Sequence, residues 1–290
     1  MLYLQLYYNN NSVMKNRFVL GLVALLLLSG SCGWLVLKHR WKDILSPVTP
    51  MTPYNVTEHH DDTLRVLMIG DSWADMHLSF DSLLHKYIEN MLNIPVRMES
   101  RGRGGAKSKD VYYLMNDKTT AIGDLRDGYG TQEILKNGAD YCVVLVGIND
   151  AAANYGAENY CKNMEAIIDF LIQLKMVPVI VEMPCVDIRT LYARKTLYNI
   201  VTDWVRSRMT CCRMYDVEPY GEAMLEKFQE RIKKKEIIFV CKGQWNEKGC
   251  EDERGLYLRD KIHLNARGYA LLDSCLAIVI SDDVLHKRRH

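Results

Sequence analysis

Short runs of apolar residues recur along the chain, and longer stretches with apolar residues at helical spacing separate them. Residues 64–69, 141–146 and 177–182 are such runs, and the second is continuous enough for a strand buried on both faces. Residues 95–99 and 213–216 continue the series as two shorter strands. The alternation predicts a parallel sheet with helices on both faces. In sheets of this kind, sites form where the strands have their carboxyl ends.

The N-terminal region has a different pattern. Residues 18–37 contain no charged side chain, and basic residues flank them on both sides. As a helix, this stretch would span roughly 30 Å, about the thickness of a hydrocarbon core. An uncleaved anchor, a cleaved signal peptide and lipidation at Cys32 are the three interpretations. A lipidation motif needs a Leu-like residue where Ser29 stands, and apolar residues continuing to Leu37 favour the anchor.

These patterns divide the chain into four parts. Residues 1–42 form an N-terminal tail with the apolar segment, and residues 43–62, with three prolines, form an extended linker. Residues 63–283 form one catalytic domain, and residues 284–290 form a short basic tail. All three interpretations of the N-terminus usually place the domain outside the cytoplasm. We therefore expect a membrane-anchored protein in the periplasm or at the cell surface.

Charge and cysteine content narrow the function classes. Lys and Arg number 37 against 36 Asp and Glu, a formal charge of +1, so no global field favours nucleic acid as a partner. Among the nine cysteines, Cys241 and Cys250 flank a polar stretch, and a disulfide could close that loop in an oxidising compartment. No spacing of cysteines and histidines indicates a zinc site.

The first predicted strand ends in Gly70-Asp71-Ser72-Trp73. Gly70 permits a tight turn, and a serine at the start of the following helix has an exposed hydroxyl and a backbone N–H without an intrahelical acceptor. Such an N–H can face an oxyanion. A simple helix cap by Asp71 or Ser72 explains the tetrapeptide equally well when it is considered alone.

Two further segments carry residues suited to catalysis. Gly147-Ile148-Asn149-Asp150 follows the strand at 141–146, and an Asn side chain there can donate to a developing negative charge. Asp260 and His263 lie three residues apart, just before a helix that begins near Ala266. The carboxylate can hold one ring nitrogen while the other faces a serine. Taken singly, the first segment also fits an ordinary turn and the second a surface loop.

In their order along the chain, these motifs resemble blocks I, III and V of the SGNH (GDSL-type) hydrolases. Residues 100–108 follow the second predicted strand and resemble block II, and Gly105-Ala106-Lys107-Ser108 is similar to the family's Gly-x-x-Ser turn. The four blocks cover about 200 residues, from Gly70 to Tyr269. The resemblance implies a three-layer α/β/α flavodoxin-like fold with a five-stranded parallel sheet.

The resemblance also implies a Ser-His-Asp triad. Ser72 would attack the substrate, His263 would take its proton, and Asp260 would orient His263. His77, on the helix after Ser72, is the alternative base. Block I usually has Leu where this chain has Trp73. The indole could narrow the acyl pocket, offer a stacking face for a sugar, or pack into the core.

The same resemblance implies an oxyanion hole formed by the backbone N–H groups of Ser72 and Gly105 and the side chain of Asn149. Gly102 and Gly104 are alternatives to Gly105. The chemistry requires no metal and no organic cofactor. The acidic residues of the two strand-end motifs would be structural supports: Asp71 and Asp150.

SGNH hydrolases cleave acetyl esters on glycans, longer acyl esters in lipids, and thioesters. This chain has no long apolar lid segment, which favours a short acyl ester, and a membrane-tethered domain suits O-acetyl groups on cell-envelope or capsular glycans. The alternatives are an acetyltransferase with the same triad, a lipid acyl hydrolase, and a non-catalytic glycan-binding protein. All three triad positions are filled, which argues against the last.

Overall fold

The computed structural model describes residues 48–80, 82–116, 130–189 and 196–289, with a few positions between 30 and 46. The chain forms two compact units, Met1–Ser46 and Pro47–His290. Among the described residues, no helix is long and apolar enough to cross a membrane. The apolar segment predicted at 18–37 lies almost entirely outside the described residues.

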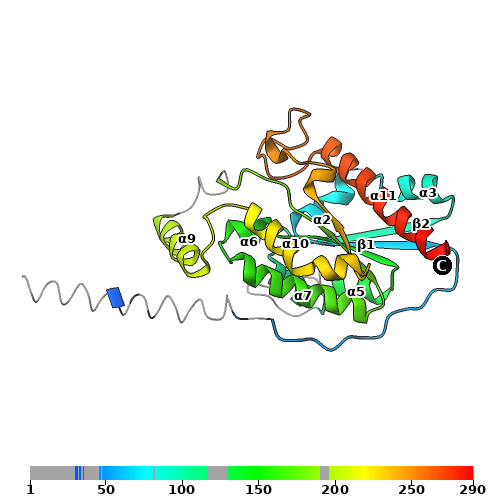
Figure 1. Ribbon diagram of the computed structural model, residues 1–290, viewed down its shortest axis with the longest axis horizontal. Helices are drawn as coiled ribbons and strands as arrows, with labels where there is room; N and C mark the ends of the chain where they lie inside the picture. Colours follow the sequence, from blue (N-terminus) through cyan, green and yellow to red (C-terminus); the bar gives the residue numbers. More distant parts are fainter. Residues whose placement is uncertain are drawn as a thin grey trace, which may run out of the picture. The chain divides into compact units, whose positions relative to one another are not determined.

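The second unit is built on a five-stranded sheet in which every neighbouring pair is parallel, in the order β2-β1-β3-β4-β5 (Figure 1). This confirms the predicted parallel α/β fold. The strands run along the following residues: β1 Leu64–Gly70, β2 Val96–Gly102, β3 Tyr141–Leu145, β4 Val177–Val181 and β5 Ile238–Val240.

Helices cover both faces of the sheet, so that the unit has three layers (Figure 1). One face carries α3 (Leu84–Leu92) and α11 (Ala266–Arg289). The other carries α4 (Ser108–Leu114), α5 (Thr131–Lys136), α7 (Ala157–Gln173) and α10 (Glu218–Lys233). Three more helices follow the carboxyl ends of strands: α2 (Ser72–His77), α6 (Ile148–Ala152) and α9 (Leu197–Thr210). Single 3-10 turns lie at Leu78–Phe80, Lys242–Gln244 and Gly249–Glu251.

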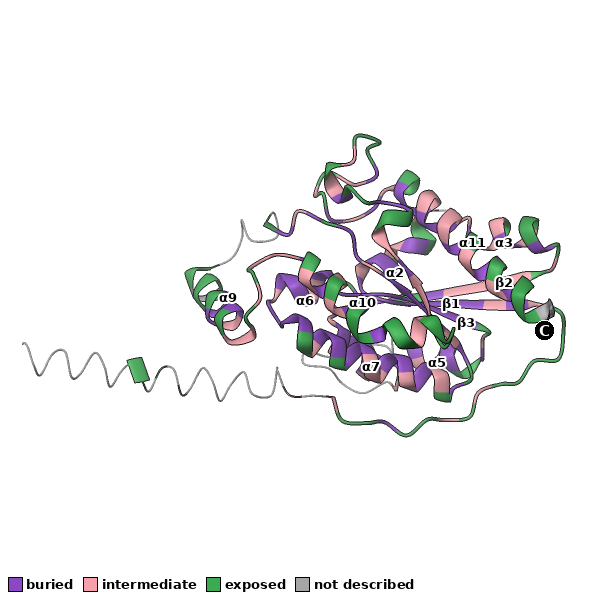
Figure 2. Ribbon diagram, in the orientation of Figure 1, coloured by how far each residue is buried: buried purple, intermediate pink, exposed green. Residues whose placement is uncertain are grey.

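Burial follows the position of each strand in the sheet (Figure 2). All five residues of the central strand β3 are buried, as the apolar run predicts, because helices cover both of its faces. In the edge strand β2 only Ser100 and Gly102 are buried, and the other residues are half-buried or exposed.

The fifth strand lies elsewhere than predicted. Residues 213–216 form turns between α9 and α10, with Tyr215 at a φ of 62°. The strand that pairs with β4 is β5, one helix further along the chain. Residues 213–216 are too few for their sequence pattern to identify a strand. Which short segment joins the sheet depends on its pairing with β4, a contact between residues distant in sequence.

Two predicted boundaries also shift. The expected linker is extended, but its described part packs on the domain instead of standing free. Met51 is 7% exposed and its N–H donates to the Tyr112 hydroxyl at 2.9 Å, and the Tyr54 ring lies edge-on to Phe170. At the other end, the predicted tail at 284–290 continues α11 to Arg289.

Candidate active site

Ser72 is the first residue of α2, at the carboxyl end of β1, which lies between β2 and β3. The turn before it is tight, because a Cβ at Gly70 would collide with the carbonyl of Leu145 on β3. Asp71 caps the helix by accepting the Trp73 N–H at 2.9 Å. The helix cap and the exposed serine, which the sequence offered as alternatives, are therefore compatible. Asp71 is the cap, and Ser72 has an N–H without an intrahelical acceptor.

The loop before α11 brings the predicted base and carboxylate to this serine. His263 Nε2 lies 2.9 Å from Ser72 Oγ, although 191 residues separate them in sequence. His263 Nδ1 lies 2.6 Å from Asp260 Oδ2. Ser72, His263 and Asp260 thus form a continuous hydrogen-bonded relay.

Asp260 also organises its own loop. Its Oδ1 accepts the backbone N–H groups of Ile262 at 2.9 Å and His263 at 3.0 Å. Partial burial alone would raise the pKa of Asp260, but hydrogen bonds from the His263 side chain and from these two N–H groups outweigh it and hold that pKa below its usual value. Asp260 is therefore ionised at neutral pH and keeps the proton of the imidazole on Nδ1.

Trp73 anchors the same loop from below. The residue is fully buried, its Nε1–H donates to the Ile262 carbonyl at 3.1 Å, and its ring packs edge-on against Trp245. The Tyr269 hydroxyl donates to the Trp73 carbonyl at 3.0 Å. Of the three interpretations of Trp73, core packing is correct, because a side chain with no exposed surface cannot stack on a sugar. Its indole ties the helix of Ser72 to the loop of His263.

The block II loop forms the opposite side of the site. β2 ends at Gly102, where a Cβ would collide with the backbone of Asp71 and Asp75, so this glycine serves close packing. Gly105 lies in the exposed turn beyond it at a φ of 79°, which favours glycine. Gly104 is exposed in the same turn. Gly102 thus packs against the start of α2, while Gly104 and Gly105 lie in the exposed turn that follows β2.

Asn149 lies in the first turn of α6, after the carboxyl end of β3. Its Nδ2 donates to Asp71 Oδ2 at 3.2 Å and to the Ala106 carbonyl at 3.0 Å. The side chain joins the loops after β1, β2 and β3. Both of its N–H groups are engaged within the protein, a detail that the sequence motif does not reveal.

Beneath these loops lies a buried polar cluster. Asp150 accepts the Ser108 N–H at 2.9 Å and the Ser108 hydroxyl at 2.6 Å, and Asn163 Nδ2 donates to the same Oγ at 3.0 Å. Burial raises the pKa of Asp150 to about 6 and that of Asp71 to about 7. Sequence reasoning missed Ser108 as the partner of Asp150. It also missed Asn163, whose only signal is a polar residue on the apolar face of α7.

His77 is not placed to serve as the base. It is fully buried at the end of α2, where its Nε2 lies 2.6 Å from Asp273 Oδ1, and its ring lies edge-on to Tyr269. Asp273 Oδ2 in turn accepts the Leu83 N–H at 2.9 Å. His77 and Asp273 join α2 to α11 as a structural pair, which leaves His263 as the histidine at Ser72.

The predicted disulfide is not formed, since Cys241 and Cys250 are both free thiols. Cys250 instead lies beside Cys185, to whose carbonyl its N–H donates at 2.8 Å. Within the described ranges, no group of three or more His, Cys, Asp and Glu side chains is arranged to hold a metal ion.

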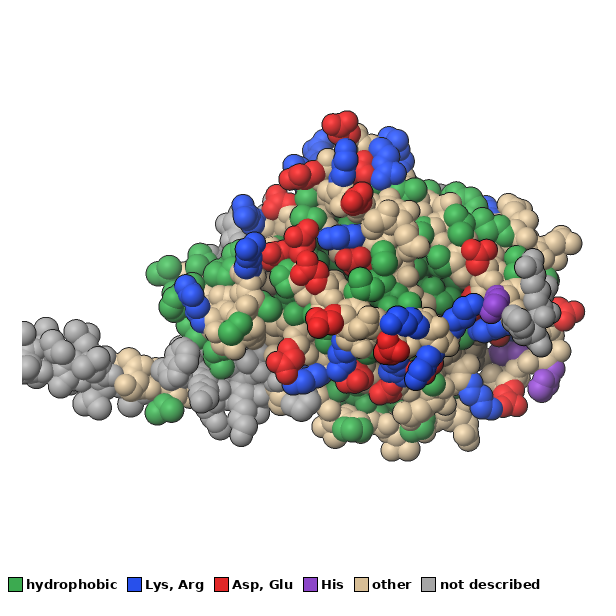
Figure 3. All heavy atoms as spheres, in the orientation of Figure 1, with side chains coloured by type: hydrophobic (Ala, Val, Ile, Leu, Met, Phe, Trp, Pro, Cys, Tyr) green, Lys and Arg blue, Asp and Glu red, His purple; other side chains and the backbone are tan. Residues whose placement is uncertain are grey.

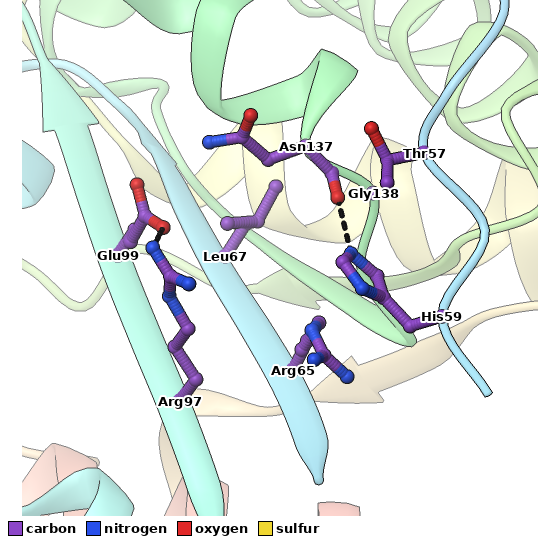
Figure 4. Close-up of a pocket in the computed structure, with 8 residues that line it drawn as sticks. All are labelled: Thr57, His59, Arg65, Leu67, Arg97, Glu99, Asn137 and Gly138. Carbon is purple, nitrogen blue, oxygen red and sulfur yellow. Dashed lines mark hydrogen bonds and ion pairs between the residues drawn. The ribbon is translucent and has the colours of Figure 1, made fainter. Parts of the chain in front are cut away.

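A cavity of about 170 Å³ lies away from these residues, beside β1 and β2 (Figure 4). Arg65 and Leu67 of β1 and Arg97 and Glu99 of β2 line it, and His59 closes it with a 2.6 Å contact to the Asn137 carbonyl. None of the predicted site residues borders this cavity. It is separate from the relay of Ser72.

No protein-family model matches the sequence, and no curated protein matches it. Solved structures do match in fold. The lipase/acylhydrolase from Enterococcus faecalis matches with a TM-score of 0.50 and 15% identity, over 76% of this chain and 96% of that one. The fold is that of the SGNH hydrolases.

Two other matches have lower TM-scores. A GDSL-like lipase from Bacteroides thetaiotaomicron has a TM-score of 0.46 and 13% identity, over 76% of this chain and 88% of that one. A variant of an acetyl-xylooligosaccharide esterase from Geobacillus has a TM-score of 0.48 and 12% identity, over 75% and 93%. In the SGNH fold of this chain, the Ser72 relay lies at the carboxyl edge of the sheet, where sites of parallel sheets form.

Proposed function

We propose that this protein is a serine esterase in which Ser72 is the nucleophile, His263 the general base and Asp260 the residue that orients His263. The observation that carries the proposal is the relay of 2.9 Å from Ser72 Oγ to His263 Nε2 and 2.6 Å from His263 Nδ1 to Asp260. Both distances are within hydrogen-bond reach, as proton transfer during acylation requires.

In the proposed reaction, Ser72 Oγ attacks the ester carbonyl carbon while its proton passes to His263 Nε2. The tetrahedral intermediate collapses to an acyl-enzyme, and the alcohol leaves with the proton from His263. Water then attacks the acyl carbon and gives its proton to His263. When the bond from the acyl carbon to Ser72 Oγ breaks, His263 returns that proton to Oγ and the acid is released. Asp260 stays ionised throughout and stabilises the imidazolium that forms at each attack.

The backbone N–H groups of Ser72 and Gly105 and the side chain of Asn149 are proposed to stabilise the oxyanion. The first is supported by the position of Ser72 at the start of α2. For Asn149, one of the two N–H groups now engaged by Asp71 and Ala106 has to turn to the oxyanion. We propose that the bond to the Ala106 carbonyl is the one exchanged, since Ala106 directly follows Gly105 in the block II turn.

The proposed substrate is a short acyl ester, with O-acetyl groups on cell-envelope or capsular glycans as the class. The absence of a long apolar lid segment in the sequence supports a short acyl group. Because O-acetyl glycans at the cell surface are accessible only to proteins outside the cytoplasm, this substrate requires an extracytoplasmic domain, and a membrane anchor would supply that location. We propose that residues 18–37 provide that anchor and that the domain lies in the periplasm or at the cell surface.

The test is hydrolysis of p-nitrophenyl esters of increasing acyl length by the full chain, followed by a panel of O-acetylated glycans. Ser72→Ala should abolish turnover and leave the unfolding temperature nearly unchanged, because the hydroxyl supplies the covalent step. Full turnover by Ser72→Ala would refute the assignment of the nucleophile. Acetate appearing on an added sugar instead of in solution would identify a transferase, and preference for long acyl chains would identify a lipid hydrolase.

A further inference from the structure

The outer face of α9 is apolar, although it faces solvent. Leu197, Ile200, Val201 and Trp204 are 76%, 41%, 48% and 51% exposed. Their spacing places them on one side of the helix, where residues three and four apart are neighbours. Together they form a continuous stripe, which we call the α9 stripe. Figure 3 shows hydrophobic side chains gathered over this projecting part of the molecule.

The inner face of the same helix is mostly polar, with Val205 as a buried apolar residue among polar ones. Thr202, Asp203 and Ser207 are 7%, 3% and 7% exposed. Local hydrogen bonds satisfy two of them, from Thr202 Oγ1 to the Asn199 carbonyl at 2.8 Å and from Ser207 Oγ to the Trp204 carbonyl at 2.7 Å. A surface helix normally buries its apolar stripe and exposes its polar side. The reversed arrangement of α9 indicates that another apolar phase covers the stripe.

The charge of residues 189–213 indicates which kind of apolar environment covers the α9 stripe. Between residues 189 and 213 the sequence has six basic residues and one acidic residue, whereas the whole chain has a formal charge of only +1. The basic residues are Arg189, Arg194, Lys195, Arg206, Arg208 and Arg213. The Arg208 guanidinium lies 5.6 Å from the centre of the Trp204 ring, beside the stripe. An apolar stripe with a Trp and neighbouring cations is typical of helices that lie in the interface of an anionic bilayer.

The position of α9 relates the stripe to the active site. Arg206 on its inner side donates to the Ala153 carbonyl at 3.2 Å, and Ala153 directly follows α6, the helix of Asn149. The α9 stripe therefore belongs to the edge of the sheet at which Ser72 lies.

The length of chain between the proposed anchor and the domain adds a second constraint. Only ten residues, 38–47, separate the apolar segment from Val48, which packs on the core. Fully extended, they reach at most about 35 Å. With residues 18–37 as the proposed anchor, a linker of this length keeps Val48 within about 35 Å of the bilayer.

We propose that the α9 stripe inserts into the interface of an anionic phospholipid bilayer and holds the active-site edge of the domain against the membrane. The docking goes beyond ester hydrolysis and does not depend on it. It rests on the described helix and its charge, and the proposed anchor adds to it by limiting the distance.

The test measures whether Trp204 of the full chain contacts lipid. The protein is reconstituted into vesicles of phosphatidylcholine with phosphatidylglycerol, with and without brominated acyl chains that quench tryptophan on contact. The chain has five tryptophans, so the Trp204 signal is the difference between the wild type and Trp204→Phe. The double variant Leu197→Ser/Val201→Ser removes half of the stripe. Leu225→Ser, at a residue of α10 that is 46% exposed, is the matched control.

We expect bromolipid to quench the Trp204 signal, more weakly without phosphatidylglycerol, and the double variant to lose the quenching while Leu225→Ser retains it. An unquenched Trp204 signal in both lipid mixtures overturns the proposal. A signal that changes with protein density but not with lipid composition also overturns it and identifies a contact between copies of this chain. Hydrolysis of a water-soluble ester by the same samples checks the fold of each variant. If the wild type fails to hydrolyse any ester, the enzymatic proposal fails, and the quenching still decides the docking.

Discussion

Replacing Asp260 by Asn tests the proposed relay, because the substitution removes the charge of the side chain and nearly keeps its shape. An Asn side chain has nearly the same shape, and its Oδ1 can still accept the N–H groups of Ile262 and His263 that Asp260 accepts at 2.9 and 3.0 Å. The loop should therefore keep its conformation. What changes is the 2.6 Å contact to His263 Nδ1, where an amide donor replaces a carboxylate acceptor.

The amide donor forces the His263 proton from Nδ1 to Nε2, so Nε2 can no longer accept the proton of Ser72. The corresponding change in the serine-protease triad lowers kcat about 10⁴-fold. Here the Asp260 side chain is 41% exposed, so water replaces part of the lost charge. We therefore expect a loss of about 10³- to 10⁴-fold in kcat/KM, which is about 4 to 5.5 kcal/mol of transition-state stabilisation.

The assay is kcat/KM for a short p-nitrophenyl ester, with thermal unfolding of the same samples. Asp61→Asn is the control, because Asp61 is also a carboxylate with a lowered pKa, held by Arg65, at the opposite end of β1. It should leave kcat/KM unchanged. A loss of less than about tenfold in Asp260→Asn, with the wild-type pH profile, would refute the relay. A large fall in unfolding temperature would show that Asp260 acts chiefly on the loop.

Three further predictions concern the groups around the relay. Asn149→Ala should lower kcat by about 10² to 10³ with a smaller effect on KM, as for the loss of one oxyanion donor, and steady-state kinetics in which only KM rises would contradict that role. Trp73→Phe leaves the Ile262 carbonyl without its donor and loosens the loop of His263, so it should lower the free energy of unfolding in denaturant by about 2 to 3 kcal/mol. It should also lower kcat more than it raises KM, and unchanged kinetics would show that catalysis does not need the hydrogen bond from Trp73 to Ile262. Asp150 has a folded-state pKa raised to about 6, so between about pH 4 and 6 the folded state binds more protons than the unfolded state, and the contribution of Asp150 to stability falls as pH rises. Asp150→Asn should flatten the fall in unfolding temperature across that range, and a slope equal to the wild type would contradict the raised pKa.

Much of the fold could be predicted because its signals are local. The apolar runs of β1, β3 and β4 reflect strands that are buried on both faces, and the helical spacing between them reflects crossover helices. The fifth strand could not be predicted in the same way. β5 has three residues, and its place in the sheet depends on pairing with β4, a contact that no local pattern records.

The sequence by itself determined the candidates for the proposed chemistry, since Gly-Asp-Ser, Gly-x-Asn-Asp and Asp-x-x-His each lie next to a strand end or a helix start. Only the tertiary structure decided how these residues meet. It engages both N–H groups of Asn149, buries Trp73 under the loop of His263, and pairs His77 with Asp273 away from Ser72. It also turns the apolar side of α9 to solvent. The helical spacing of the apolar residues predicts that such a side exists, but it does not say whether that side faces the core or the solvent. The physical reason is that periodicity and turn chemistry are encoded within a few residues, whereas burial and hydrogen-bond partners depend on segments that folding brings together from as far as 196 residues apart.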